Sequence, residues 1–301
     1  MRLSIAALVL LLGLPLARAE EPAPPPPSAT EEAEKPYTEG WRGGSPPGEH
    51  VAFRAELWAL SKQRSAIEIG RGLRFHPLTT TDLGHPSRGA AGGLGVELYT
   101  GKTGWLSLDW WTQQARGGTT LAREISLADV TFAPGSQIDS EITQHTLRVR
   151  DGLDIRYRIP IAAETWLDFN FGPVSALLVR YESIEIRTLG AAGPRSRASL
   201  LGVTLSPGLR AGVDLHVVDG FTVRVGSDVD FLPNLRHNFL SFTRAPSVDT
   251  SADARAYLAV RFQFVELAVG WRYFKSLASG GRFRHAESEM RGLFAELAAR
   301  F

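Results

Sequence analysis

Apolar and polar residues alternate along most of the chain beyond residue 50. The longest example lies between Leu201 and Phe231, where odd positions are apolar while charge and glycine occupy the even ones. A period of two residues is typical of a β-strand, and Val218-Asp219-Gly220 between the two halves is the short connection of an antiparallel hairpin. Strands of a globular sheet usually have about 5–6 residues, so the first run is too long for one. A strand that crosses a bilayer needs ~9–11 residues, with lipid on one face and a polar lumen on the other. The pattern therefore predicts membrane-spanning strands.

The same alternation predicts ten strands. Long connections at 61–91, 114–141, 183–198, 232–252 and 276–290 alternate with connections of a few residues. A barrel in a membrane has short turns at one end, longer loops at the other and an even strand number. We therefore predict an all-β fold, a single antiparallel up-and-down transmembrane barrel, with eight or twelve strands as the alternatives. The predicted strand ranges are 50–60, 92–100, 104–113, 142–159, 163–182, 201–217, 221–231, 253–264, 266–275 and 291–301.

The N-terminus predicts export. A basic residue at Arg2 precedes an apolar run over residues 3–16 and an A-x-A cleavage site at residues 17–19. We predict a cleaved signal peptide at 1–19, a proline-rich, acidic, disordered linker at 20–48, and the barrel at 49–301. The alternative for the linker is a tether to a periplasmic partner, since it carries Tyr37 and Trp41.

Composition narrows the chemistry further. The chain has no cysteine, which excludes disulfides and thiolate catalysis. The formal net charge is +1, without the concentrated basic patch that nucleic-acid binding needs. The seven histidines are scattered singly, without metal-binding spacing. We therefore predict no cofactor, no metal and no nucleic-acid partner.

The last predicted strand alternates apolar residues up to a C-terminal phenylalanine. On this feature, the signal peptide and the alternation over 50–301, the chain resembles the small outer-membrane β-barrel proteins of Gram-negative bacteria. The resemblance implies an integral outer-membrane location with a periplasmic linker, and contact with membrane lipid and lipopolysaccharide. It also implies recognition by the barrel-assembly machinery, through Leu293, Ala295, Leu297, Ala299 and Phe301. Ala299 departs from the family pattern, in which this position is often bulkier. The resemblance identifies a class and not one function.

Charged residues collect at the positions that face the lumen. Arg148, Arg150, Arg156 and Arg158 form a ladder, and the planar guanidinium suits ion pairs with carboxylates of adjoining strands. We expect these partners to be Glu164, Asp168 and Asp109. A barrel of about eight strands is filled by its side chains, whereas about 16 leave a channel. We therefore predict a lumen that is largely plugged, or a narrow, anion-preferring path. The candidate lumen residues are Arg148, Arg150, Arg156, Arg158, Asp168, Arg210, Asp214, Arg224, Asp228 and Asp230.

The function predicted from these features is that of a non-enzymatic outer-membrane protein, either structural or a narrow porin-like pore. The alternative is an outer-membrane enzyme with its site at the extracellular rim. Asp228, Asp230 and His237 lie where omptin-like proteases carry their catalytic acids, although the local motifs do not match. His145 has lipid-facing parity near the outer rim, where a lipid A or phospholipid hydrolase needs a His–Ser pair. His216 has lumen parity and fits a hydrogen-bond network, so no catalytic residue is assigned.

Overall fold

The computed structural model describes residues 40–43, 50–69, 78–100, 103–128, 130–190, 193–218, 220–232, 247–280 and 283–301. The predicted signal peptide, most of the predicted linker and His237 lie outside these ranges. Among the described residues, no helix is long and apolar enough to span a membrane.

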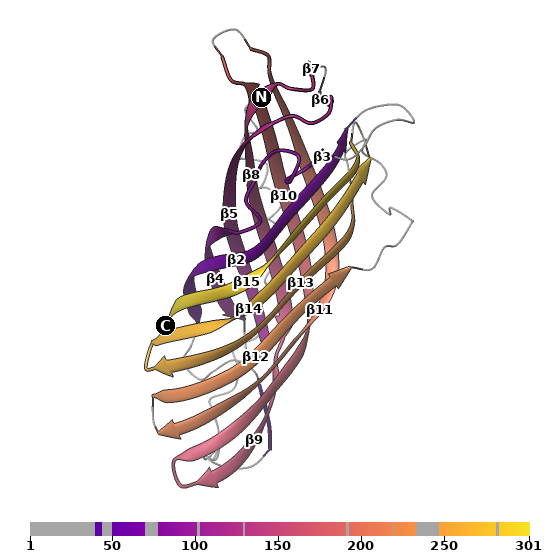
Figure 1. Ribbon diagram of the computed structural model, residues 1–301. Coiled ribbons are helices and arrows are strands. Elements are labelled where there is room, and N and C mark those ends of the chain that lie inside the picture. The colour runs from indigo at the N-terminus through magenta and orange to yellow at the C-terminus, as the bar shows by residue number, and fades with distance from the viewer. Residues whose placement is uncertain are drawn as a thin grey trace. The chain divides into compact units, whose positions relative to one another are not determined.

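Ten antiparallel strands form a closed barrel (Figure 1). Each strand pairs with the next along the chain, and the last pairs with the first, which closes the sheet. β8 and β9 both pair with β10 and act as one strand of the wall. The predicted all-β, ten-stranded antiparallel barrel is therefore confirmed. Its strands are β2 (Val51–Ile69), β4 (Gly89–Thr100), β5 (Gly104–Thr120), β8 (Gln137–Leu153) with β9 (Ile155–Ala162), β10 (Thr165–Thr188), β11 (Arg195–Val218), β12 (Phe221–Leu232), β13 (Ser247–Phe262), β14 (Val265–Gly280) and β15 (Phe283–Arg300).

Four shorter strands lie outside this set. β1 (Gly40–Gly43) pairs with β9, although its residues fall within the predicted linker. β3 (Leu78–Thr79) pairs with β2. β6 (Ile125–Leu127) and β7 (Val130–Phe132) form a separate hairpin.

The register of the wall fixes how steeply its strands are inclined. Starting at Phe169 on β10 and following directly paired residues around the other strands leads back to β10 at Tyr181, a stagger of 12 residues. With ~3.3 Å per residue and ten strands ~4.8 Å apart, this stagger corresponds to a tilt of about 40° from the barrel axis. The value is typical of closed barrels, so the pairing is consistent with the strand number.

The two ends of the barrel differ as expected. At one end, here called the turn end, residues 101–103, 163–164, 219–220 and 263–264 make the connections. Gly220 has a φ of +76°, which favours glycine at the predicted hairpin between β11 and β12. The opposite end, here called the loop end, carries the longer connections 70–88, 121–136, 189–194 and 233–246. The predicted long connection 276–290 is the exception, because only residues 281–282 join β14 to β15.

The strands extend further toward the loop end than the sequence pattern predicts. Residues 183–198 and 276–290 were expected to be loops, but β10, β11, β14 and β15 continue through most of both ranges. Their outward side chains include Glu185, Arg187 and Glu289, so the outward positions are polar here while the backbone pairing continues. In β10 the alternation is reversed, because Ile184 and Ile186 face inward.

The outer face of the wall is predominantly apolar. Large side chains such as Leu57, Leu267 and Leu293 are at least 60% exposed and occupy the predicted outward positions. On the loop-end side of this band, Trp110, His145 and Tyr181 stack across three strands, with ring centroids 6.2 and 6.3 Å apart. Aromatic residues at the edges of an apolar band are typical of membrane interfaces.

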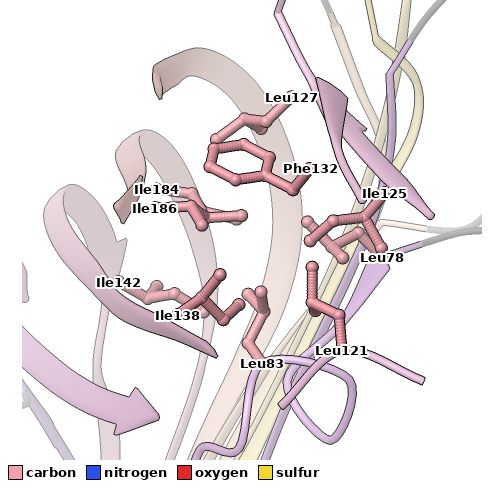
Figure 2. Close-up of a cluster of buried hydrophobic side chains, with 10 residues drawn as sticks. All are labelled: Leu78, Leu83, Leu121, Ile125, Leu127, Phe132, Ile138, Ile142, Ile184 and Ile186. Atoms are coloured by element: carbon pink, nitrogen blue, oxygen red, sulfur yellow. The ribbon is translucent and has the colours of Figure 1, made fainter. Parts of the chain in front are cut away.

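An apolar cluster lies at the loop end, between wall strands and connecting segments (Figure 2). We call residues 78–85, 121–128 and 130–132 the loop-end plug, because their apolar side chains pack on β8 and β10. A hydrogen bond attaches the plug to the wall: Ser140 Oγ on β8 donates to the Leu83 carbonyl at 3.0 Å. Gly117 provides space for it, because a Cβ there would lie 2.6 Å from the Leu83 oxygen. The cluster consists of Leu78, Leu83, Leu121, Ile125, Leu127, Phe132, Ile138, Ile142, Ile184 and Ile186.

Candidate functional site

The lumen of the barrel holds an ion-pair network, which we call the charged core. In the described residues it has ten arginines and eleven carboxylates, each within 4.0 Å of an opposite charge. Their side chains are 20% exposed at most. The members are Arg54, Arg148, Arg150, Arg156, Arg158, Arg210, Arg224, Arg255, Arg272 and Arg300, with Glu56, Glu97, Asp109, Asp154, Asp168, Asp214, Asp228, Asp230, Asp253, Glu266 and Glu296.

Two arginines of the predicted ladder lie at the centre of this network. Arg148 binds Asp109 at 3.2 Å and Asp230 at 3.3 Å, and it also pairs with Asp253. Arg150 is fully buried, 3.4 Å from Asp228 and 3.5 Å from Asp109. One guanidinium therefore bridges carboxylates that come from different strands of the wall.

The other two ladder arginines share one carboxylate. Arg158 binds Asp168 at 2.8 Å, and Arg156 approaches the same residue at 3.5 Å. Glu164, which we expected to be a further partner, is exposed in the turn between β9 and β10. That expectation was wrong because the strand ends at Ala162, so the parity of the strand does not apply to Glu164.

The remaining predicted lumen residues also lie in the charged core. Arg210 contacts Glu97 at 3.1 Å and Asp228 at 3.4 Å, and its guanidinium lies 3.7 Å from the centre of the Trp105 ring. Arg224 forms a 2.6 Å ion pair with Asp214. All ten predicted residues therefore have inward side chains that form ion pairs in the lumen.

The members of the charged core that the sequence prediction did not single out include Asp253, Glu266, Arg272, Glu296 and Arg300. Each lies on a predicted strand, at a position that alternates with the apolar, outward-facing residues of that strand. The alternation could therefore have identified these residues as inward-facing. Arg272 binds Asp253 at 2.8 Å and Glu56 at 2.7 Å. Its guanidinium also lies over the rings of Trp58 and Trp111, 5.1 and 4.5 Å from their centres.

The charged core leaves little free space. Two cavities within it have volumes of about 40 and 20 Å³. A single water needs roughly 10–15 Å³, so each cavity has room for a few waters at most. The geometry is that of a filled interior.

Two of the three histidines with assigned hypotheses, His216 and His145, occupy different environments, and His237 lies outside the described residues. His216 stacks on Trp166 at 4.5 Å, lies 2.9 Å from Thr222 Oγ1 and approaches Asp168 at 3.3 Å, as expected for a lumen network. His145 stacks on the outer face between Trp110 and Tyr181. Asp228 and Asp230 are buried in the charged core and do not form an open acidic pair. Within the described ranges, no group of three or more acidic or histidine side chains is arranged to hold a metal.

His85 is a buried histidine that the sequence did not single out. It belongs to the loop-end plug, and its Nε2 lies 2.9 Å from Ser140 Oγ. Burial lowers the pKa of His85 to about 4, so the ring is neutral near pH 7. Because the Ser140 hydroxyl also contacts the carbonyls of Leu83 and Gly117, the pair attaches the plug to the wall.

The C-terminal strand completes the closure of the barrel. Leu293 and Leu297 are 66% and 51% exposed on the outer face, and Phe301 stacks on Phe264 at 6.0 Å. The Phe301 backbone N–H donates to Val51, and its carbonyl accepts from Val51. Ala295 also faces outward, while Ala299 is half-buried. The predicted assembly signal therefore coincides with the strand that joins the two ends of the sheet.

Comparison with known proteins gives similarity at low identity. No protein-family model and no curated protein matches the chain. Among solved structures, Ail, the attachment invasion locus protein of Yersinia pestis, is 12% identical, with 82% of this chain and 99% of that chain covered and a TM-score of 0.26. The translocator domain of the autotransporter NalP from Neisseria meningitidis is 12% identical, covering 84% and 89%, with a TM-score of 0.26. A Pseudomonas aeruginosa FadL homologue is 11% identical, covering 84% and 91%, with a TM-score of 0.25. By its own geometry, a closed antiparallel barrel that is apolar outside and charged inside, the chain has the architecture of the outer-membrane β-barrel proteins of Gram-negative bacteria.

Proposed function

We propose that the protein is a structural, non-conducting barrel of the bacterial outer membrane. The observation that carries this proposal is the charged core, in which ten arginines and eleven carboxylates neutralise one another across the lumen. An anion-selective path needs arginines whose charge is available to passing ions. Here each ladder arginine is already bound to a carboxylate within 3.5 Å.

The loop-end plug supports the same proposal from the other side of the lumen. Its buried apolar cluster packs against inward-facing isoleucines of β8 and β10, so apolar side chains fill this part of the lumen. A conducting state would need both the plug and the charged core to rearrange.

The enzyme alternative has less support. A hydrolase at the outer rim needs an accessible nucleophile or acid, whereas Asp228 and Asp230 are 3% and 4% exposed within the charged core. His145 is occupied by stacking between two aromatic rings.

In this proposal the turn end faces the periplasm and the loop end faces outward. The aromatic residues at the loop-end side of the apolar band then lie at the outer leaflet, where lipopolysaccharide is the neighbouring lipid. The C-terminal strand, from Leu293 to Phe301, is the segment that the assembly machinery would recognise.

The proposal is tested in planar lipid bilayers with the full-length mature chain. Insertion is first verified by the change in gel mobility on heating, so that silence cannot result from failed insertion. We expect no stable current steps, and no turnover of lipid A or of peptide substrates by the same preparation. Reproducible anion-selective steps would overturn the proposal in favour of the pore, and turnover would overturn it in favour of the enzyme.

A further inference from the structure

We call the line along which two neighbouring strands pair a seam. At the seam between β5 and the strand formed by β8 and β9, the two strands end at different heights at the turn end. Across the other seams, neighbouring strands end within about two residues of each other, as the pairs Phe221–Phe262, Val265–Ala299 and Arg300–Ala52 show. β5, however, begins at Gly104 opposite Leu153, while β9 continues from Ile155 to Ala162 beyond it. β10 pairs with one edge of β9, but β5 does not pair with the other edge.

This edge belongs to an apolar part of the wall. Ile159 and Ile161 on β9 are 38% and 60% exposed, and Phe169 and Phe171 on β10 are exposed beside them. Backbone N–H and C=O groups that face hydrocarbon without a partner are each destabilising by several kcal/mol. An edge left open here would therefore be unstable in a membrane and available to another strand.

β1 pairs with the part of this edge that is nearer β8, residues 155–158. Gly40, Trp41, Arg42 and Gly43 lie opposite Arg158, Tyr157, Arg156 and Ile155 in an antiparallel ladder. β1 pairs with β9 on the side where β5 pairs with β8, so it continues the line of β5 in the wall. Beyond it, Pro160 has no N–H to offer, and proline is a common protection of exposed strand edges.

We propose that the edge of β9 is a strand-addition site, and that Gly40–Gly43 is its resident strand. The segment completes the wall at this seam and fastens the N-terminal part of the chain to the turn end of the barrel. The resident comes from the same chain, because only six residues separate Gly43 from His50, whose carbonyl accepts a hydrogen bond from Tyr99 N–H at the start of the wall. So short a connection gives an effective concentration on the order of millimolar, which a strand from another molecule does not reach.

The absence of cysteine from the sequence makes the pairing directly testable. Opposed residues of an antiparallel pair have Cα atoms about 4.5–5.5 Å apart, which a disulfide can bridge. In the full-length chain folded in lipid, we expect Trp41→Cys with Tyr157→Cys to form an intramolecular disulfide under mild oxidation. The matched control, Trp41→Cys with Ile161→Cys, is four residues out of register and should remain reduced. Equal oxidation of both pairs, no oxidation of either, or a disulfide-linked dimer would each overturn the proposal.

Hydrogen exchange gives a second, independent measurement. In a variant that lacks residues 20–43, we expect the β9 backbone amides that bond to β1 to exchange at least tenfold faster, while β12 amides keep their protection. Unchanged β9 protection would show that β1 is not needed, and protection restored by dimerisation would identify a second copy as the occupant. Both measurements report strand pairing and do not depend on conductance. The strand-addition proposal can therefore fail while the proposed closed-barrel function stands, and the closed-barrel function can fail while the strand-addition proposal stands.

Discussion

Arg272 shows how a single guanidinium is stabilised in the barrel interior. It is 2% exposed, bonds Asp253 through Nε and Nη2, and bonds Glu56 through Nη1. Taking a charge out of water is unfavourable, and the loss is recovered only when hydrogen bonds satisfy the whole group. The nearby rings of Trp58 and Trp111 add cation–π attraction.

Removing this guanidinium should therefore destabilise the barrel strongly. Arg272→Met keeps most of the side-chain volume but leaves Asp253 and Glu56 undercompensated, and we expect a loss of about 3–5 kcal/mol in the free energy of unfolding. Arg116→Met is the matched control, because Arg116 is 74% exposed and its pair with Glu141 should contribute at most ~1 kcal/mol. Urea unfolding in lipid vesicles measures both. Similar midpoints for the two variants would contradict the structural importance of the charged core.

At the residue scale, alternation predicts which way a side chain points but not what it contacts. It placed Arg148 and Asp168 inward because both lie within long paired strands. It failed at Glu164, where the strand had already ended. The partners of Arg148 include Asp230 and Asp253, from the opposite side of the barrel, and such pairs depend on the stagger of the closed sheet.

At the scale of elements, the loop-end plug is held by a small number of polar contacts around its apolar cluster. Asp82 accepts hydrogen bonds from Thr79 N–H at 2.9 Å and from Arg123 at 3.0 Å, which joins the two segments of the plug. Ser196 Oγ donates to the Leu127 carbonyl at 2.6 Å and holds the second segment against β11. The His85–Ser140 contact holds the first segment.

The attachment of the first plug segment should weaken in acid. The pKa of His85 is about 4 in the folded protein against an ordinary value of 6.5, so the released loop binds a proton more readily than the docked loop. Docking is therefore strongest above pH 6.5 and weakens as the pH falls toward 4, by about 2–3 kcal/mol at pH 4.5. Hydrogen exchange at the His85 amide, corrected for intrinsic rates, measures the change. His85→Gln keeps a hydrogen-bonding group but does not titrate, so an equal pH response in this variant would refute the assignment.

The extents of the elements were less predictable than their existence. β10 and β11 reach 24 residues each because their loop-end parts continue to pair where the outward positions are polar, so the apolar outer face that marks the other strands is missing there. The plug segments carry isolated leucines and isoleucines that resemble ordinary loop residues until β8 and β10 supply the facing isoleucines. β1 gave no signal because four residues are too few to show a period, and its partner edge exists only after the barrel closes.

At the scale of the whole molecule, strand number and closure follow from the sequence because each hairpin is a local feature. The stagger of 12 residues between Phe169 and Tyr181 is a property of all seams together, and no single hairpin carries it. The uneven seam between β5 and β9 is a consequence of where each strand ends relative to that stagger. The closed sheet leaves an apolar outer face that only a nonaqueous environment can cover.

The outer face provides the test of that environment. Val269 on β14 is 58% exposed and lies between Val265 at the turn end and the stacked pair Trp271 and Tyr273 toward the loop end. If lipid covers this face, Val269→Arg should reduce the free energy of unfolding from lipid vesicles by ~2–4 kcal/mol, since a guanidinium near the bilayer midplane loses its hydration. Gln137→Arg is the control, because Gln137 is exposed at the loop end of β8, beyond the stacked aromatic residues, where the charge remains in water. We expect this variant to change stability by less than about 0.5 kcal/mol. If Val269→Arg were as stable as Gln137→Arg, the apolar band would not be facing lipid, and the membrane location that the proposed function assumes would have to be abandoned.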